Sequence, residues 1–124
     1  MNYKLDLNER PFKAIKAGTK KVEGRTPEND TDTMFDDMKA GDTITFINNI
    51  SQEEITCEVL YVSKYPNVKL MLETEGTKNV LSSGGNVEEG IKSFDSLEGY
   101  KERILKYGVY AIAISYISEN VKSI

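Results

Sequence analysis

The fold of this chain is decided by the stretch GVYAIAISYI, which spans residues 108–117. Its side chains are almost all apolar and several are β-branched, which favours an extended strand. Strands with one face in water alternate between apolar and polar residues, whereas a continuous apolar run is typical of a strand that is buried on both faces. We therefore expect residues 108–117 to form a buried strand that closes the fold.

Four further strands are expected upstream of this segment. Residues 53–65, EEITCEVLYVSKY, alternate most regularly between inward and outward side chains. Residues 43–47 place Ile44 and Phe46 on one face, and the pair Asn48–Asn49 predicts a hairpin or meander connection to the strand that follows. Two shorter strands are expected at residues 3–7 and 20–25.

Helices are expected between these strands. Asn8 and Gly18 are suitable caps for a helix over residues 9–17, in which Phe12 and Ile15 share a face. Polar residues predict loops at 26–37 and 82–86, and the last residues, 118–124, are expected to fray. Further helical patterns cover residues 67–76, 87–94 and 96–107, the last with Leu97, Tyr100, Ile104 and Leu105 on one side. Strands on both sides of a central helical segment predict an α+β domain with a small, mostly antiparallel barrel.

The composition narrows the possible chemistry. At 124 residues the chain has the length of a single domain, residues 1–124, and its 39% hydrophobic content is ordinary for a globular protein. There is no histidine, which excludes Ser–His triads and histidine-ligated zinc. The first residues do not form a signal peptide, no segment is long and apolar enough for a membrane, and the single Cys57 fits a reducing compartment, so we expect a cytoplasmic protein.

Charge is distributed unevenly along the chain. The net charge is −4, which argues against broad neutralisation of nucleic-acid phosphates. Residues 1–25 nevertheless hold seven basic and three acidic side chains, a net charge of +4, which leaves −8 for the remainder. An anion-binding surface, if the chain has one, is therefore expected in the N-terminal fifth.

The stretch GTKKVEGR, residues 18–25, concentrates these charges. Strand alternation puts Lys21, Glu23 and Arg25 on one face, and the long side chain of Lys20 can still reach Glu23. Solvated strand charges are one explanation, and we assign Lys21 to it. A ligand site is the other: Arg25 offers a planar fork for a phosphate or a base edge, Lys20 a point charge, and Glu23 an acceptor for an exocyclic amine.

The segment LNERPFKAIKAGTKKVEGR, followed by KAGDTITF at residues 39–46, resembles the ASCH domain of the PUA-like superfamily. The later YPNVKLMLETEG, the turn at residues 82–85 and the closing KYGVYAIAI extend the resemblance over nearly the whole chain. It implies a PUA-like barrel with short flanking helices and a cleft lined by Lys20, Glu23 and Arg25, which binds RNA or a nucleotide. One bacterial branch of the family hydrolyses acetylated cytidine with a lysine and a threonine, and Glu23 stands where that threonine would be.

Other candidate residues carry weaker patterns. Ser82 and Ser83 precede two glycines, and their hydroxyls and backbone N–H groups are suited to an anion. Tyr65, and less so Tyr100 and Tyr107, are candidates for stacking on a base. The spacing of Asp36, Asp37 and Asp42 matches no calcium loop, and we predict neither a metal nor a cofactor. Cys57 alternates with apolar neighbours and is expected in the core.

Three functions remain open from the sequence. The first is a module that binds RNA or a nucleotide-like ligand through Lys20, Glu23, Arg25, Tyr65, Ser82 and Ser83. The second is a hydrolase acting on a modified nucleoside or on RNA, with Lys20 as base and Glu23 as its acid–base partner. The third is a domain whose acidic remainder contacts a protein partner. The sequence does not decide whether the protein is an enzyme.

Overall fold

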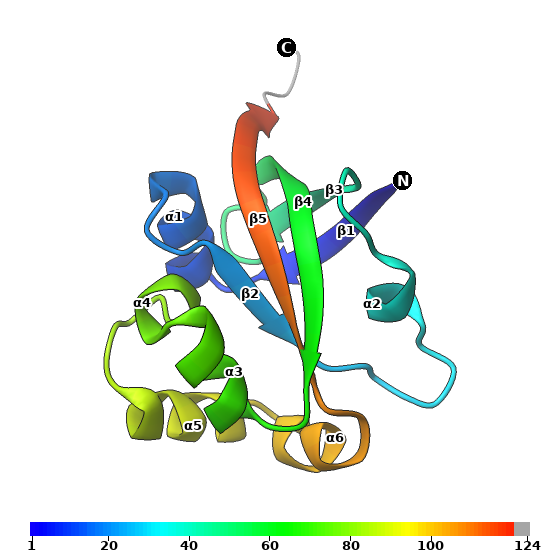
Figure 1. The fold of residues 1–124 in the computed structure, drawn as a ribbon. Helices are drawn as coiled ribbons and strands as arrows, with labels where there is room; N and C mark the ends of the chain where they lie inside the picture. The colour runs from blue at the N-terminus through cyan, green and yellow to red at the C-terminus, as the bar shows by residue number, and fades with distance from the viewer. Residues whose placement is uncertain (121–124) are drawn as a thin grey trace.

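The structure is a computed structural model that describes residues 1–120, and in this range it contains five strands and six helices (Figure 1). The strands are β1 (Asn2–Leu7), β2 (Val22–Arg25), β3 (Thr43–Asn48), β4 (Glu54–Tyr65) and β5 (Val109–Asn120). The helices are α1 (Glu9–Ala17), α2 (Met34–Asp37), α3 (Val68–Glu75), α4 (Thr77–Val80), α5 (Val87–Asp95) and α6 (Tyr100–Tyr107). Every strand expected from the sequence is present.

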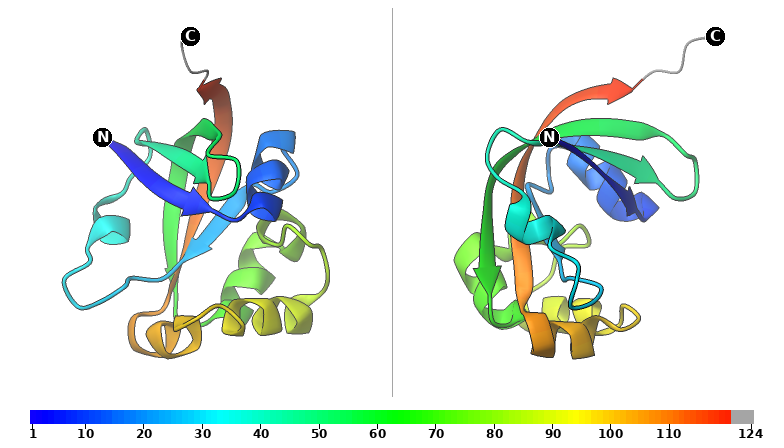
Figure 2. Two further views of the ribbon diagram at one scale, coloured as in Figure 1. Left: turned by 180° about the vertical axis from the view of Figure 1, so that it is seen from behind. Right: turned by 90° about the vertical axis from the view of Figure 1, so that its right-hand side faces the viewer.

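The strands form one mixed sheet in the order β1-β3-β4-β5-β2. β1 runs parallel to β3, and the other three pairings of the sheet are antiparallel. The sheet curls into a half-barrel, as the second view of Figure 2 shows, with β1 and β2 as its two edges. The predicted α+β fold with a mostly antiparallel, barrel-like sheet is confirmed.

The strand β5 explains why its sequence is apolar without alternation. Tyr110, Ile112 and Ile114 belong to the core inside the curled sheet, together with residues from β3, β4 and α1. Val109, Ala111 and Ala113 belong to a second core that packs against α3, α4, α5 and α6. Burial on both faces is therefore confirmed for the first half of this strand.

The expectation is wrong for residues 115–117, which are exposed. The reason is that β2 pairs with β5 only as far as Ala113, and the helical core also ends there. The Ile114 N–H still bonds to the Lys21 carbonyl, and beyond it β5 pairs with β4 alone, up to Asn120. Fraying was expected from residue 118, so the strand is longer than predicted. Residues 121–124 lie outside the described part of the chain.

Two short helices were not expected from the sequence. The helix α2 lies in the predicted loop 26–37, where the buried Phe35 anchors it in the core and the Asp32 carboxylate accepts the Met34 N–H at 3.1 Å. The helix α4 follows directly after Gly76. Tertiary burial rather than helix propensity holds such single turns in place.

The last helix differs from its prediction in extent and in orientation. It begins at Tyr100 and not at residue 96, after Gly99 in a left-handed conformation. Ile104 is buried, but Leu105 is 81% exposed and Leu97 is 40% exposed. The side chains expected on one side of this helix, Leu97, Tyr100, Ile104 and Leu105, therefore do not share one buried face.

Figure 1 shows the arrangement that positions the site. The helices α3, α4, α5 and α6 gather at one end of the sheet, and α1 lies nearer the other end, with the edge strand β2 between them. Of the helices in residues 1–120, none has the length and apolar character needed to cross a membrane.

Candidate functional site

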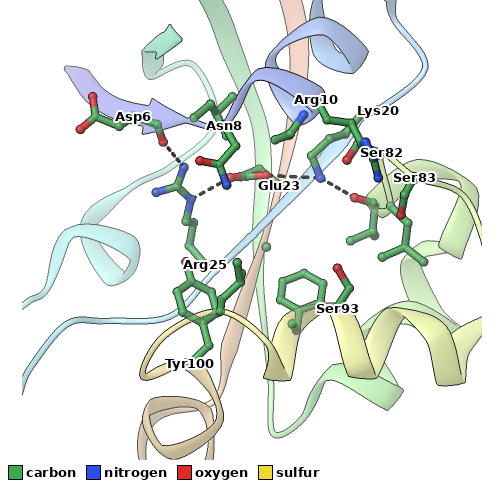
Figure 3. A pocket seen from close by; sticks show the side chains of 17 residues that line it. Asp6, Asn8, Arg10, Lys20, Glu23, Arg25, Ser82, Ser83, Ser93 and Tyr100 are labelled. Atoms are coloured by element: carbon green, nitrogen blue, oxygen red, sulfur yellow. Dashed lines mark hydrogen bonds and ion pairs between the residues drawn. The ribbon is translucent and has the colours of Figure 1, made fainter. Parts of the chain in front are cut away.

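A cavity of about 440 Å³ lies beside the free edge of β2 (Figure 3). The end of β1 and the first turn of α1 form one wall, and residues 80–83 with α5 and the start of α6 form the other. Its polar and charged lining residues are Asp6, Asn8, Arg10, Lys20, Glu23, Arg25, Ser82, Ser83 and Ser93. Its apolar and aromatic lining comes from Leu7, Pro11, Gly24, Val80, Leu81, Phe94, Leu97 and Tyr100.

The end of α1 determines where the charged residues enter the cavity. Gly18 ends the helix with φ +80°, a conformation that glycine adopts readily, and its N–H bonds to the carbonyls of Ala14 and Ile15. The chain then turns back, and Lys20 N–H also bonds to the Ala14 carbonyl. This sharp reversal brings Lys20 under the helix and starts β2 two residues later.

Lys20 is buried, and its ammonium group has three acceptors. Its Nζ lies 2.8 Å from the Val22 carbonyl oxygen and 3.3 Å from Glu23 Oε1, and it also donates to the carbonyl of Val80. The side chain is 5% exposed. The expected reach from Lys20 to Glu23 is confirmed. The ammonium ion carries three protons, so these contacts occupy all of them.

Glu23 lies between the two cations, as the dashed lines in Figure 3 show. Its Oε1 faces Lys20, and its Oε2 accepts from Arg25 Nε at 2.7 Å. Arg25 also donates from Nη2 to the carbonyl oxygen of Asp6 at 2.7 Å, which links the two edge strands of the half-barrel. Within residues 1–120 the Nη1 group of Arg25 makes no hydrogen bond, so one arm of its guanidinium has no partner there.

Burial and neighbouring charge act against each other on these groups. Burial opposes the charge of Glu23, but Arg25 and Lys20 outweigh it, and the pKa of the carboxyl lies below its usual value. For Lys20 burial prevails over the attraction of Glu23 and lowers the pKa of the amine. Burial also opposes the charge of Arg25, yet Glu23 raises the pKa of its guanidinium further. The three groups form a charged network of net charge +1.

Gly24 lines the cavity without a side chain, because the packing beside it leaves no room for one. A Cβ atom at this position would lie 2.8 Å from Phe94 Cζ and 3.2 Å from Met71 Cε, closer than ordinary packing permits. The register of β2 directs the N–H and C=O groups of Glu23 and Arg25 towards β5, and those of Gly24 towards the free edge. At this point the cavity is therefore lined by the backbone of Gly24 and by the neighbouring ring of Phe94.

The structure brings five of the six predicted ligand-binding residues together. Lys20, Glu23, Arg25, Ser82 and Ser83 all line this cavity. Tyr65 is not among the lining residues, and its hydroxyl donates to Glu75 instead. Of the other two tyrosines considered, Tyr100 lines the cavity, whereas Tyr107 donates to Asp30 elsewhere. Lys21 is exposed and lines a separate cavity with Leu60 and Tyr116.

The acidic residues considered for a metal have other partners. Asp36 accepts from the Tyr110 hydroxyl, Asp37 from the Thr33 hydroxyl at 2.9 Å, and Asp42 from the Lys39 N–H at 3.0 Å. Residues 1–120 contain no group of three metal-ligating side chains. Cys57 is fully buried, as expected, and burial raises the pKa of its thiol to about 12.

Sequence reasoning did not select Arg10, Ser93 or Phe94. One signal was available for Arg10: it lies in the first turn of α1, where the helix dipole disfavours a cation. Asn8 occupies the N-cap position as predicted, but its side chain does not cap the helix and accepts from Asn49 at 2.6 Å. Ser93 and Phe94 carry no such signal, since only the packing of α5 brings them to the cavity.

The chain has clear relatives. The ASCH domain family model matches residues 5–118. The crystal structure of hypothetical protein PH0355 is 36% identical in sequence, with a TM-score of 0.78 over 94% of this chain and 100% of that one. The solution structure of protein PF0455 from Pyrococcus furiosus is 32% identical, with a TM-score of 0.70 over 94% and 98%.

A more distant structure shares the fold alone. It is a mutant of ZmASCH from Zymomonas mobilis, with 17% identity and a TM-score of 0.60 over 94% of this chain and 71% of that one. No curated protein matches the chain.

Proposed function

Since the chain belongs to the ASCH domain family, we propose that it binds RNA or a nucleotide-like ligand, and that a base of this ligand occupies the cavity beside β2. The observation that carries the proposal is the buried Lys20–Glu23–Arg25 network at a cavity of about 440 Å³. Ligand sites in proteins have volumes of this order, mostly apolar walls and a few fixed polar groups. Apolar side chains of similar size often stabilise a protein as well as a buried ion pair does, so a charged network held at a cavity favours recognition over structure.

The cavity offers the chemistry that a nucleobase requires. The free Nη1 group of Arg25 is a donor for a ring nitrogen or a carbonyl oxygen. The carboxylate of Glu23, fixed between two cations, is an acceptor for an exocyclic amine. Phe94 and Tyr100, which also line the cavity, supply aromatic surface on which a base can stack. A base that carries both an exocyclic amine and an acceptor atom, such as cytosine, offers partners for both Glu23 and Arg25.

Calorimetric titration with the four ribonucleosides and with short single-stranded RNA tests this proposal. Arg25→Ala is expected to abolish binding, and Lys21→Ala, a change of an exposed cation outside the cavity, is the matched control. Thermal melts of both variants establish that they remain folded. Ser93→Leu fills the cavity from α5 and leaves the charged network in place. Wild-type affinity in a folded Ser93→Leu variant and a folded Arg25→Ala variant would exclude the cavity.

A hydrolase that acts on a modified nucleoside or on RNA is the second candidate. In its favour, burial lowers the pKa of Lys20 beside a carboxylate, which is the usual way to prepare a lysine as a base. Against it, the three acceptors around Nζ hold the protons that a base would have to release. Incubation with acylated nucleosides and RNA tests the candidate, and turnover that Lys20→Ala and Glu23→Gln both eliminate would establish it.

A further inference from the structure

Arg10 is a cation at the cavity without a partner in the described chain. Its side chain is exposed, lines the cavity, and within residues 1–120 takes part in no hydrogen bond or ion pair. Lys13, one turn further along α1, is paired with Glu9 at 3.4 Å and does not line the cavity. The Arg10 guanidinium is therefore available to a ligand in the cavity, whereas the Lys13 ammonium is paired and lies outside the cavity.

The charged lining of the cavity is positive although the protein is acidic. Three cations, Arg10, Lys20 and Arg25, face two carboxylates, Asp6 and Glu23, on a chain whose net charge is −4. Glu23 is already engaged by both buried cations, and the Asp6 side chain is exposed. A neutral ligand would leave this excess positive charge uncompensated, whereas an anionic ligand would neutralise it.

The cavity has two chemically different ends. In Figure 3, Arg25 is drawn towards Asp6 and Tyr100, and Arg10 towards Ser82 and Ser83. Within residues 1–120 the Ser82 hydroxyl makes no hydrogen bond, and the Ser83 hydroxyl has only a contact of 3.5 Å to the Gly84 carbonyl. A guanidinium and two hydroxyls are donors that suit the oxygens of a phosphate, and the glutamate lies nearer the middle.

We propose that the ligand is a phosphorylated nucleoside, whose phosphate binds Arg10, Ser82 and Ser83 while its base contacts Arg25 and Glu23. This inference rests on the proposed function and specifies its ligand class. A free nucleotide carries this phosphate as a monoester and RNA carries it as a diester, and both present the same anionic oxygens to Arg10. An unphosphorylated nucleoside fills only the Arg25 end.

Calorimetry with matched ligands tests the inference. The titrants are the four ribonucleosides, their 3′- and 5′-monophosphates, and dinucleoside monophosphates, which carry an internal diester and no terminal phosphate. One charge-assisted contact predicts that the preferred nucleotide binds about tenfold more tightly than its nucleoside. Arg10→Gln is expected to bring that ratio close to one without changing the affinity for the nucleoside. Lys13→Gln, the matched change on α1, is expected to keep the ratio.

The outcomes separate this inference from the proposed function. Equal affinity of wild-type protein for a nucleoside and its phosphates would overturn the inference and leave the cavity as a base site. A preference for phosphates that survives Arg10→Gln would also overturn it. Binding of none of these ligands would overturn the proposed function itself. Tighter binding of the dinucleoside monophosphate identifies RNA as the source of the phosphate, and tighter binding of a monophosphate identifies a free nucleotide.

Discussion

Glu23→Gln removes the carboxylate that Lys20 and Arg25 both contact, while keeping the size of the side chain. The side chains of Lys20 and Glu23 are only 5% and 8% exposed, so water replaces little of the lost attraction. Breaking a buried ion pair by removing one partner costs about 3–5 kcal/mol in proteins. With an unfolding entropy of about 2.1 cal/mol/K per residue, or roughly 260 cal/mol/K for this chain, the melting temperature should fall by about 12–19 °C.

Glu9→Gln is the matched control for this measurement. Glu9 pairs with Lys13 on the surface of α1, at 3.4 Å, with side chains that are 50% and 70% exposed. The same chemical change there should cost less than about 0.5 kcal/mol, because exposed pairs are screened by water. Thermal unfolding followed by circular dichroism at pH 7 measures both variants.

The pH dependence gives an independent check on Glu23. Its pKa is lower in the folded protein than its ordinary value of 4.5, so below that value the unfolded chain binds the proton more readily than the folded one. Its contribution to stability is complete above about pH 4.5 and is lost as the pH falls through the folded pKa. The difference in melting temperature between wild type and Glu23→Gln should therefore shrink in acid. A difference under about 3 °C at pH 7, or one that is equal at pH 7 and pH 3, would refute the reasoning.

Three further predictions concern packing and reactivity. Gly24→Ala places a methyl group 2.8 Å from Phe94 and should destabilise the fold by about 1–3 kcal/mol in urea titrations, and an unchanged midpoint would contradict the tight contact. Cys57, whose thiol pKa is raised to about 12, should react with a thiol reagent at pH 8 only when the protein is unfolded, and rapid labelling of the native protein would contradict its burial. Phe12→Ala, at a side chain that is 1% exposed, should cost about 3–5 kcal/mol by the same urea assay, and a loss under 1 kcal/mol would show that α1 is not anchored there.

The sequence was sufficient for those features that depend on local pattern. The apolar run at residues 108–117 predicted a strand buried on both faces, and this is confirmed up to Ile114, where each face meets a different core. Gly18 predicted the helix end that turns the chain into β2. The contact between Lys20 and Glu23 followed from the spacing and from the length of the lysine side chain.

The other features of the cavity and of the fold depend on how distant segments pack together, which no local sequence pattern indicates. Ser93 and Phe94 reach the cavity because α5 packs beside β2, and neither position has a distinguishing pattern. Tyr65 was selected for its aromatic chemistry, but it is directed to Glu75 and not to the cavity. The helix α2 was missed because one turn has little propensity of its own, and the burial of Phe35 decides it.

The central claim, that the cavity beside β2 holds the base of a nucleotide-like ligand, is tested most directly by an NMR titration of the backbone amides. The predicted result with the tightest-binding nucleotide is that shift changes concentrate at Gly24, Ser82 and Ser93, which line the cavity from three separate segments of the chain. Changes concentrated instead around Lys21 and Tyr116, at the separate cavity they line, would contradict the claim.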